Sequence, residues 1–568
     1  MKNSKRRKHF VLAGLSLAKW NRQIPRLSGS LTAAIFIWAS GLPTARAEGP
    51  ALLTEIAVRS VTWEGIKGEK VRLVLDRALE SQRPEAINRE QVDKLAALLT
   101  ERLRKAGFPI AQVMVSQEDW TLFEQTGELK FRVFEGEIGA LRVGKNTSRI
   151  ATSRLERTAR DALCPQGVGD VCVMTTERFE RASLLLQDLP GVRLYPVELS
   201  PEGVGRGQTA VVVSAEPSQP PYSGSVTVDN YGAQATGTKR LAASIMANNW
   251  LHMGDVWQGT VLATNREQYT GSLGFSAPLS YTGLRTQANL SHTTYTVSAV
   301  NARGTADSGS LGLAYPLARG LGRNWTIGLD GADILSKLEV AGQQASAPRH
   351  IGKLQFTLSG NSGDQSVQAG SDYWSAGVSA GGGRVTQSLV GVDPSDTRGN
   401  YGKLAFNVLS KINLASDKWY TLLNLRGQWA LRNLDPYEQM AIGGQTGVRA
   451  YRPDEGSLSQ GALLSVELHR LVSLPNGDRL APGVFVDYAN GWILHHPYAS
   501  WQTNLGFVDA SLSNHRVLSD IGIGIDWVSS HGMTGGLSIA TRLPSSRDSI
   551  NHPGSARWRV FASLGVGF

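Results

Sequence analysis

The last twelve residues of the chain constrain its fold more than any other segment. From Arg557 to Phe568, large apolar residues alternate with residues that are charged or mostly small. Such a period of two places the two sets of side chains on opposite faces of a β-strand. One wholly apolar face and one polar face are typical of a strand in the wall of a membrane β-barrel, which has lipid outside and a polar interior. The alternative is an edge strand of a soluble β-sandwich. The apolar positions are Trp558, Val560, Ala562, Leu564, Val566 and Phe568.

Short alternating runs of the same kind extend back to Tyr222. Turn residues separate them, and no convincing amphipathic helix interrupts them. The sequence also has no apolar run near the roughly 18 residues that a membrane helix needs. Because every backbone polar group in lipid must be paired, a sheet can cross a membrane only as a closed barrel. We therefore predict that residues 222–568 form an all-β transmembrane barrel of a bacterial outer membrane. Clear examples of these runs are 225–230, 240–248, 255–264, 271–277 and 285–292.

Residues 55–216 have a mixed α/β pattern that is typical of a domain outside the membrane. Two successive units each combine an amphipathic helix with short strands. We expect the first unit to have a helix at 91–106 and strands at 56–63, 112–115 and 128–134. We expect the second unit to have a helix at 176–189 and strands at 192–199 and 209–215. A stiff Pro-rich linker at 217–221 then marks the boundary with the barrel.

The net charge of +10 at pH 7 first suggests a nucleic-acid partner, but the distribution of the charge argues against one. Residues 1–47 hold nine Lys or Arg and no Asp or Glu, which leaves only +1 on residues 48–568. The same segment contains a short apolar stretch at 31–39 and the small residues Ala45 and Ala47. We predict that residues 1–47 are a signal peptide and that 48–54 form a short N-terminal segment. The alternative is a membrane anchor, although the apolar stretch is too short to span a bilayer.

The chain has two cysteines, Cys164 and Cys172. An exported chain enters an oxidising compartment, so a local disulfide is expected. A zinc site would need more ligands than this pair, and the surrounding sequence offers no histidine. We therefore predict a structural disulfide, no metal and no cofactor.

Three motifs give the chain a resemblance to the TpsB transporters of two-partner secretion, over essentially all of residues 55–568. The string GFPIAQVMV…GELKFRVFEGEI at 107–138 resembles the second half of a POTRA domain. The string IGGQTGVRAYRPDEG at 442–456 resembles the family's long inward-folded loop with its VRGY motif. The string VFVDYANG at 484–491 resembles the F-x-D-x-G motif of a neighbouring barrel strand. The resemblance implies α+β POTRA-like domains at 55–142 and 143–216, followed by a barrel of about 16 antiparallel strands.

The resemblance also implies that the motif arginine of the loop, Arg449, reaches the motif aspartate of the strand, Asp487. An arginine inside a barrel needs an acidic partner, and a bidentate pair would pin the loop. The alternative is a solvated Arg449 and a separate lumen charge at Asp487, with no contact between them. The loop motif comprises Gly443, Gly444, Val448, Arg449, Ala450 and Tyr451, and the strand motif comprises Phe485, Asp487 and Gly491.

Two positions depart from the family's motifs. Ala450 stands where the family has glycine, so we expect a different backbone angle at the loop tip. Ala489 stands where glycine is usual in the strand motif, and Gly491 comes two residues later. Some family members also carry an N-terminal helix that plugs the barrel, and the segment 48–54 leaves no room for one.

These features predict an outer-membrane translocator and not an enzyme. We expect an unfolded secreted partner, a TpsA-type exoprotein, to dock on the POTRA-like units by adding a strand to a sheet edge. The candidate edges are 112–115 and 192–199. The partner would then cross the barrel without nucleotide use, drawn by its own folding outside. The alternatives are a barrel-assembly insertase and a diffusion porin.

Other expected partners belong to the membrane and to biogenesis. They are outer-membrane lipid, periplasmic chaperones and the barrel-assembly machinery. The C-terminal strand would present an assembly signal through Trp558, Val560, Leu564, Val566 and Phe568.

Two further patterns predict no chemistry. The string GVSAG at 377–381 matches the nucleophile-elbow pattern, but that pattern requires a strand–turn–helix context. Here it leads into another strand-like run. His495 and His496 are adjacent in an expected loop and do not make a metal site alone.

Overall fold

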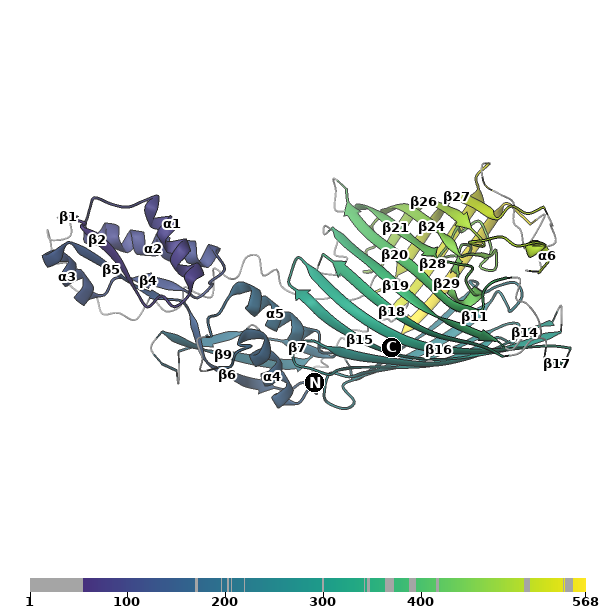
Figure 1. Ribbon diagram of the computed structural model, residues 1–568, viewed down its shortest axis with the longest axis horizontal. Helices are drawn as coiled ribbons and strands as arrows, with labels where there is room; N and C mark the ends of the chain where they lie inside the picture. The colour runs from purple at the N-terminus through teal and green to yellow at the C-terminus, as the bar shows by residue number, and fades with distance from the viewer. Residues whose placement is uncertain are drawn as a thin grey trace. The chain divides into compact units, whose positions relative to one another are not determined.

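The computed structural model describes residues 55–568, apart from gaps at 169–171, 196, 202–203, 206, 219, 299–300, 342, 345–347, 363–371, 388–394, 415–417, 505–510, 545 and 547–554. The predicted signal peptide, the segment 48–54 and the question of a plug helix lie outside the described residues. The chain divides near residue 218 into an α/β unit and a barrel unit (Figure 1).

The first half of the α/β unit is a small sheet covered by helices. Its elements are β1 (Ile56–Ala57), β2 (Ser60–Glu64), α1 (Glu69–Glu80), β3 (Ala86–Ile87), α2 (Arg89–Lys105), β4 (Gln112–Met114), α3 (Gln117–Thr126) and β5 (Glu128–Phe134). The main sheet has the order β2-β5-β4. Asn88 starts α2 through a capping box with Gln91, and Gly107, at φ +99°, follows its end. Leu95, Leu99 and other apolar residues of α2 face the core, as their spacing predicts.

The second half of the α/β unit repeats this arrangement. Its elements are β6 (Glu137–Asn146), α4 (Thr152–Leu163), α5 (Thr176–Gln187), β7 (Val192–Leu194), β8 (Glu198–Ser200) and β9 (Gln208–Pro217). Strand β9 pairs with β6 on one side and with β7 and β8 on the other. Strand β6 belongs to this sheet, although its residues 137–142 lie in the range predicted for the first domain. The strand expected at 192–199 is two short strands, and Pro196 stands between them in the sequence.

A disulfide joins Cys164, at the end of α4, to Cys172. The sulfurs belong to the apolar core between α4 and α5, where both cysteines are at most 4 % exposed. The bridge closes a loop whose ends are only eight residues apart. A loop of this length gives a modest loss of unfolded-state entropy.

Replacing both cysteines with serine should lower the free energy of unfolding of this half by about 2–3 kcal/mol. The measurement is hydrogen exchange of the buried amides of α4 and α5 in the full chain, and exchange should become faster. Reductant should reproduce the effect in the unmodified chain and leave the double variant unchanged. Equal exchange rates in both chains would contradict a stabilising role.

The barrel unit is one closed antiparallel sheet. Its sixteen long strands are β10 (Tyr222–Asp229), β11 (Arg240–Asn248), β12 (Val256–Thr264), β13 (Tyr269–Pro278), β14 (Arg285–Val297), β15 (Ala302–Arg319), β16 (Asn324–Val340), β18 (Arg349–Asn361), β19 (Tyr373–Gln387), β20 (Gly399–Asn413), β21 (Trp419–Ala430), β24 (Gln460–Arg470), β26 (Arg479–Trp492), β27 (His515–Val528), β28 (Met533–Arg542) and β29 (Trp558–Gly567). Two-residue strands, β17 (Gln343–Gln344) and β25 (Val472–Ser473), extend the wall locally. The predicted fold class is confirmed. Within the described residues, no helix has the length and apolar character that crossing a membrane requires.

The two faces of the barrel wall differ as the period of two predicts. In β29, Trp558, Leu564 and Val566 are 60 %, 52 % and 43 % exposed on the outer face. Phe561 belongs to the other face, is 2 % exposed and packs edge-on against Tyr231. A membrane barrel exposes apolar side chains in this way because lipid covers them.

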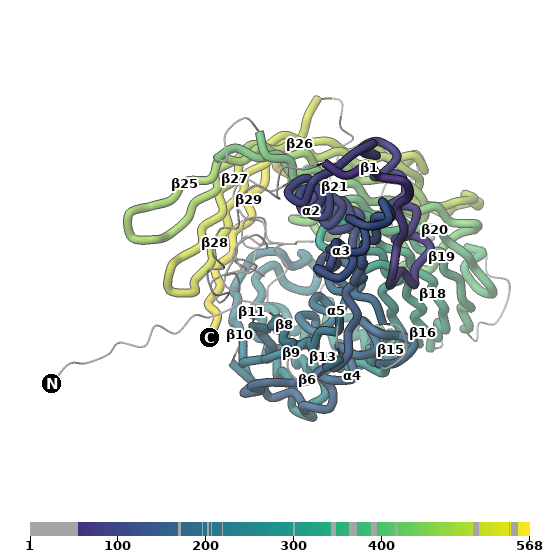
Figure 2. Tube along the Cα trace, turned by 90° about the vertical axis from the view of Figure 1, so that its left-hand side faces the viewer, coloured from purple at the N-terminus to yellow at the C-terminus, as the bar shows by residue number. Residues whose placement is uncertain are grey.

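The first and last strands close the barrel through a short seam, which lies near the C-terminus in Figure 2. Only five residue pairs between β10 and β29 are in register, from Ser225↔Gly567 to Asp229↔Ser563. The Asn230 side chain lengthens the seam, because its amide group donates to the Val560 carbonyl at 3.0 Å and accepts from the Ala562 N–H at 2.8 Å.

Candidate functional site

The loop from 431 to 459, between β21 and β24, folds into the barrel. It contains a 3₁₀ turn, η3 (Pro436–Glu438), and a small hairpin of β22 (Met440–Ala441) and β23 (Ser457–Leu458). Val448, Ala450 and Tyr451 are 0 % exposed in it. The loop motif of the sequence therefore forms a buried core with the strands around it.

The tip of this loop is a tight turn made by its glycines. Gly444 has φ +87°, which favours glycine, and the Gly447 N–H donates to its carbonyl at 2.9 Å. A Cβ on Gly443 would lie 2.0 Å from the carbonyl oxygen of Arg452. The turn brings Val448 back beside Ile442, whose carbonyl accepts the Val448 N–H at 2.8 Å. This geometry presents the next residue, Arg449, to the wall.

Arg449 and Asp487 form a bidentate ion pair, which we call the lock pair. The guanidinium Nε and Nη2 donate to Asp487 Oδ2 and Oδ1 at 2.7 and 2.8 Å, and the Arg449 backbone N–H donates to Oδ2 at 3.2 Å. Asp487 is 0 % and Arg449 7 % exposed. Although burial disfavours the charged form, the hydrogen bonds and charge of Asp487 hold the pKa of Arg449 above its ordinary value.

Three further groups surround the Arg449 guanidinium. Ser465 and Glu467, both on β24, lie 2.9 and 2.8 Å from Nη2. The ring of Phe485 lies beneath the guanidinium, and the distance from Arg449 Cζ to the centroid of the ring is 3.4 Å. Ser465 and Glu467 belong to neither sequence motif and were not among the predicted site residues. The alternating pattern of β24 predicts that both side chains point into the barrel. A period of two does not show which of the inward side chains contact a loop.

The strand motif of β26 places Phe485 and Asp487 on the inner face of the wall. Asp487 is in register with Ser465 on one side and with Asp520 on the other. Glycine is required at position 491 on steric grounds, since a Cβ there would lie 2.3 Å from the Gln460 carbonyl oxygen and 2.6 Å from Gly461 Cα. The late glycine therefore allows β24 and β26 to approach closely.

The departure at Ala450 has a simple structural reading. Ala450 is not among the residues with positive φ, so its backbone needs no glycine. Its side chain is fully buried in the core of the inward loop. Ala489, the other departure, is 1 % exposed and packs in the same core.

Breaking the lock pair would be costly, because one partner would remain as a buried unpaired charge. The pair joins the loop tip to the wall by side-chain and backbone contacts together. The arrangement can therefore hold the loop in one position inside the barrel. Movement of the loop tip would require this pair to separate.

The remaining sequence patterns lie elsewhere. The string at 377–381 is inside β19, an uninterrupted strand, and not at a strand–turn–helix junction. His495 contacts Gln460 at 2.9 Å, and the rings of His495 and His496 meet edge-on. Among the described residues, no three His, Cys, Asp or Glu side chains gather in a way that could hold a metal ion.

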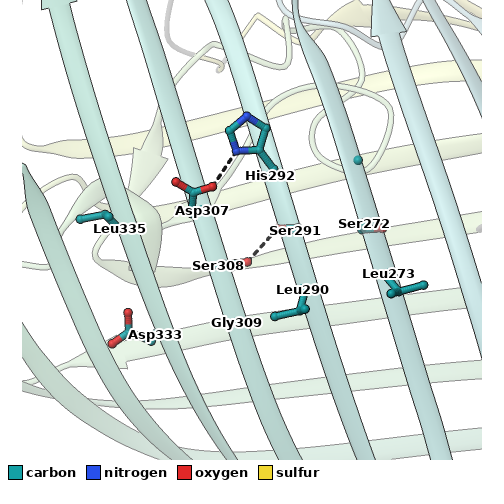
Figure 3. A pocket seen from close by; sticks show the side chains of 11 residues that line it. Ser272, Leu273, Leu290, Ser291, His292, Asp307, Ser308, Gly309, Asp333 and Leu335 are labelled. Atoms are coloured by element: carbon teal, nitrogen blue, oxygen red, sulfur yellow. Dashed lines mark hydrogen bonds and ion pairs between the residues drawn. The ribbon is translucent and has the colours of Figure 1, made fainter.

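A hollow of about 670 Å³ lies along β13 to β16 (Figure 3). Leu273 and Leu290 on its rim are 49 % and 62 % exposed and belong to the outer face of the wall. His292 lies 2.6 Å from Asp307, in register across β14 and β15. We assign this hollow to the membrane-facing surface, separate from the inward loop.

Comparisons with known proteins agree with this architecture. The model of the family described as haemolysin secretion/activation protein ShlB/FhaC/HecB matches residues 207–509. The heme/hemopexin transporter protein HuxB of Haemophilus influenzae (strain 86-028NP) is 21 % identical over 480 residues, which cover 82 % of this chain and 80 % of that protein. The outer membrane transporter CdiB of Dickeya dadantii (strain 3937) is 24 % identical over 398 residues, 67 % of this chain and 66 % of that protein.

A solved structure shares the fold over nearly the whole length. CdiB from Escherichia coli has a TM-score of 0.68 at 18 % identity, covering 94 % of this chain and 93 % of that chain. The family model covers more than half of this chain, including the loop and strand motifs around the lock pair. The chain therefore belongs to the ShlB/FhaC/HecB family of haemolysin secretion/activation proteins.

Proposed function

We propose that the barrel exports an unfolded partner protein that the α/β unit first receives on the periplasmic side. Membership of the family makes the chain a TpsB-type transporter of two-partner secretion in the bacterial outer membrane. Its partner is a secreted protein, which we propose to be of the TpsA type. The observation that carries the proposal is the inward loop, held inside the barrel by the lock pair.

The lock pair sets the resting position of the inward loop, and export requires the loop tip to leave that position. In this proposal the chain acts as a conduit for the partner and not as an enzyme. Nucleotide is absent from the periplasm, so direction comes from folding of the partner outside. The two halves of the α/β unit act as POTRA domains, at 55–136 and 137–217.

The exposed sheet edges of the α/β unit suit an incoming strand. Strands β7 and β8 lie at one edge of the second sheet, and among the described strands only β9 pairs with them. Tyr195 and Leu199 are 41 % and 45 % exposed there. Strand β4 forms an edge of the first sheet, where Met114 is 39 % exposed.

Replacing Tyr195 and Leu199 together with serine should weaken binding of the partner's amino-terminal segment about ten-fold or more. Burial of two large apolar side chains accounts for this size of effect. The measurement is binding of that segment to the purified full chain. Leu73→Ser on α1, where Leu73 is 49 % exposed, is the matched control and should bind normally. If the unmodified chain, the double serine variant and the Leu73→Ser variant bind the segment equally well, β7 and β8 are not the docking edge.

Biogenesis depends on the C-terminal strand in this proposal. Phe568 exchanges two backbone hydrogen bonds with Gly224, at 2.9 and 3.0 Å, so the terminal residue completes the seam. The exposed side chains of Trp558, Leu564 and Val566 on the same strand face outward. We propose that periplasmic chaperones and the barrel-assembly machinery bind this strand before it closes the barrel, and that outer-membrane lipid then covers it.

A further inference from the structure

A second buried charge cluster holds the start of the inward loop, apart from the lock pair. Glu438 is 2 % exposed, and its two carboxylate oxygens lie 2.7 Å from Lys353 Nζ and 2.9 Å from Lys403 Nζ. Asp435, 1 % exposed, lies 3.1 Å from Nε of Arg349. Burial acts to raise the pKa of Glu438, but the two lysines hold it below its ordinary value. The carboxylate therefore stays charged at neutral pH.

The barrel wall is built to bring the two lysines together at this point. Lys353 is on β18 and Lys403 is on β20, with β19 between them. The residues of β19 in register with the lysines are Gly383 and Gly381. A Cβ on Gly383 would lie 2.2 Å from the Gly352 carbonyl oxygen and 2.9 Å from the Lys353 Cβ, so a larger residue would force β18 and β19 apart beside the lysine. The strand between the two lysines therefore has no side chain at either position in register with them.

The cluster reverses the polarity of the lock pair. At the lock pair the loop carries the cation and the wall carries the carboxylate, whereas here the loop carries the carboxylates and the wall carries the cations. Backbone contacts reinforce the second attachment, since Lys403 Nζ donates to the Glu438 carbonyl at 2.8 Å and Gln428 donates to it at 3.3 Å. Each attachment is thus a buried ion pair supported by a backbone hydrogen bond.

The chain between the two attachments has slack. Along the wall, β20 and β26 are separated by β21 and β24, which amounts to about 14 Å at ordinary strand spacing. Ten residues lie between Glu438 and Arg449, and the eleven steps of an extended chain between them reach about 36 Å. One attachment can therefore open while the other stays closed.

We infer that Glu438, with Lys353 and Lys403, is a second anchor that positions the base of the inward loop. The anchor confines loop movement to the tip and keeps the base against β18 and β20 when the lock pair opens. This role rests on the proposed function of the lock pair and extends it. Glu438, Lys353 and Lys403 are positioning residues, since they act on transport through the place of the loop.

The test is single-channel recording of the purified full chain in planar bilayers. Glu438→Gln keeps the shape of the side chain and removes its charge, which leaves two lysines unpaired in a buried site. We expect the fraction of the recording time in which the channel is open to rise about ten-fold. The double variant Lys353→Gln with Lys403→Gln should give the same change from the wall side. Glu339→Gln, on the exposed outer face of β16, is the matched control and should behave as the unmodified chain.

Coupling to the lock pair separates an anchor from a merely structural residue. Two anchors on one loop predict that Glu438→Gln with Arg449→Ala opens the channel more than the two single effects combined. Heat-modifiable migration checks that each variant is a folded barrel. If Arg449→Ala changes the recordings but Glu438→Gln and the double lysine variant do not, the second anchor is refuted and the lock pair stands. If none of the variants changes them, the proposed role of the lock pair fails as well.

Discussion

Replacing Asp487 with asparagine should reduce secretion of the partner protein about ten-fold or more, while the barrel still assembles. The amide keeps the size of the side chain but removes the charge that faces Arg449. Arg449 would lose its bidentate partner and, among the described residues, keep only Glu467 as a close carboxylate. Breaking a buried ion pair costs about 3–5 kcal/mol, so the loop tip no longer has one preferred position. Arg449→Ala should have the same effect from the other side of the pair. Secreted and periplasmic partner protein can be measured in the same culture.

The controls for the lock pair separate geometry from charge. Arg449→Lys keeps the positive charge and loses the bidentate contact, so we expect it to resemble Arg449→Ala. Asp333→Asn removes a carboxylate that is exposed on β16 and should leave secretion unchanged. All variants should retain heat-modifiable migration. Normal secretion by both Asp487→Asn and Arg449→Ala would show that the pair does not control export.

Deleting residues 55–216 should abolish export of the partner and leave a heat-modifiable barrel in the outer membrane. The barrel closes all its strand pairings within itself, and no described strand of the α/β unit pairs with it. Its assembly therefore does not need the deleted segment, whereas recognition of the partner does. Partner protein should accumulate in the periplasm, which immunoblotting of cell fractions measures.

One outcome of the deletion would contradict the docking role of the α/β unit. Continued export of the partner by the isolated barrel would place recognition in the barrel itself. The docking variant with serine at Tyr195 and Leu199 provides the finer comparison, because it alters one edge of the sheet and keeps both halves of the α/β unit.

The barrel was predictable because membrane strands obey a simple rule. One face must be apolar along its whole length, and β29 together with Phe568 shows this pattern in eleven consecutive residues. The helices α1, α3 and α4 were missed for the opposite reason. The buried face of α4 has helical spacing, but only two of its five residues are large and apolar; they are Leu155, Thr158, Ala159, Ala162 and Leu163. Such helices form because a neighbouring sheet covers them, and a short sequence window does not contain that sheet.

Part of the site was also predictable from the sequence, and part was not. The contact of Arg449 with Asp487 was predicted from the order of two motifs, since physical chemistry alone says only that a lumen arginine needs an acid. Glu438 had no such motif, and its partner Lys353 is 85 residues away along the chain. The period of two in β18 and β20 turns both lysines inward, but their meeting point depends on the register of three strands and on the fold of the loop.

The seam between β10 and β29 has a consequence for the order of events during folding. Strand pairs elsewhere in the wall join neighbours along the chain, but the contact of Asn230 with Val560 spans 330 residues. Neighbouring hairpins can form one after another, whereas ring closure must wait until β29 is available to pair with β10. Until that step, both end strands present unpaired edges, which are prone to aggregation. Closure of the ring is thus the one pairing in the described barrel wall that depends on both the first and the last strand of the barrel.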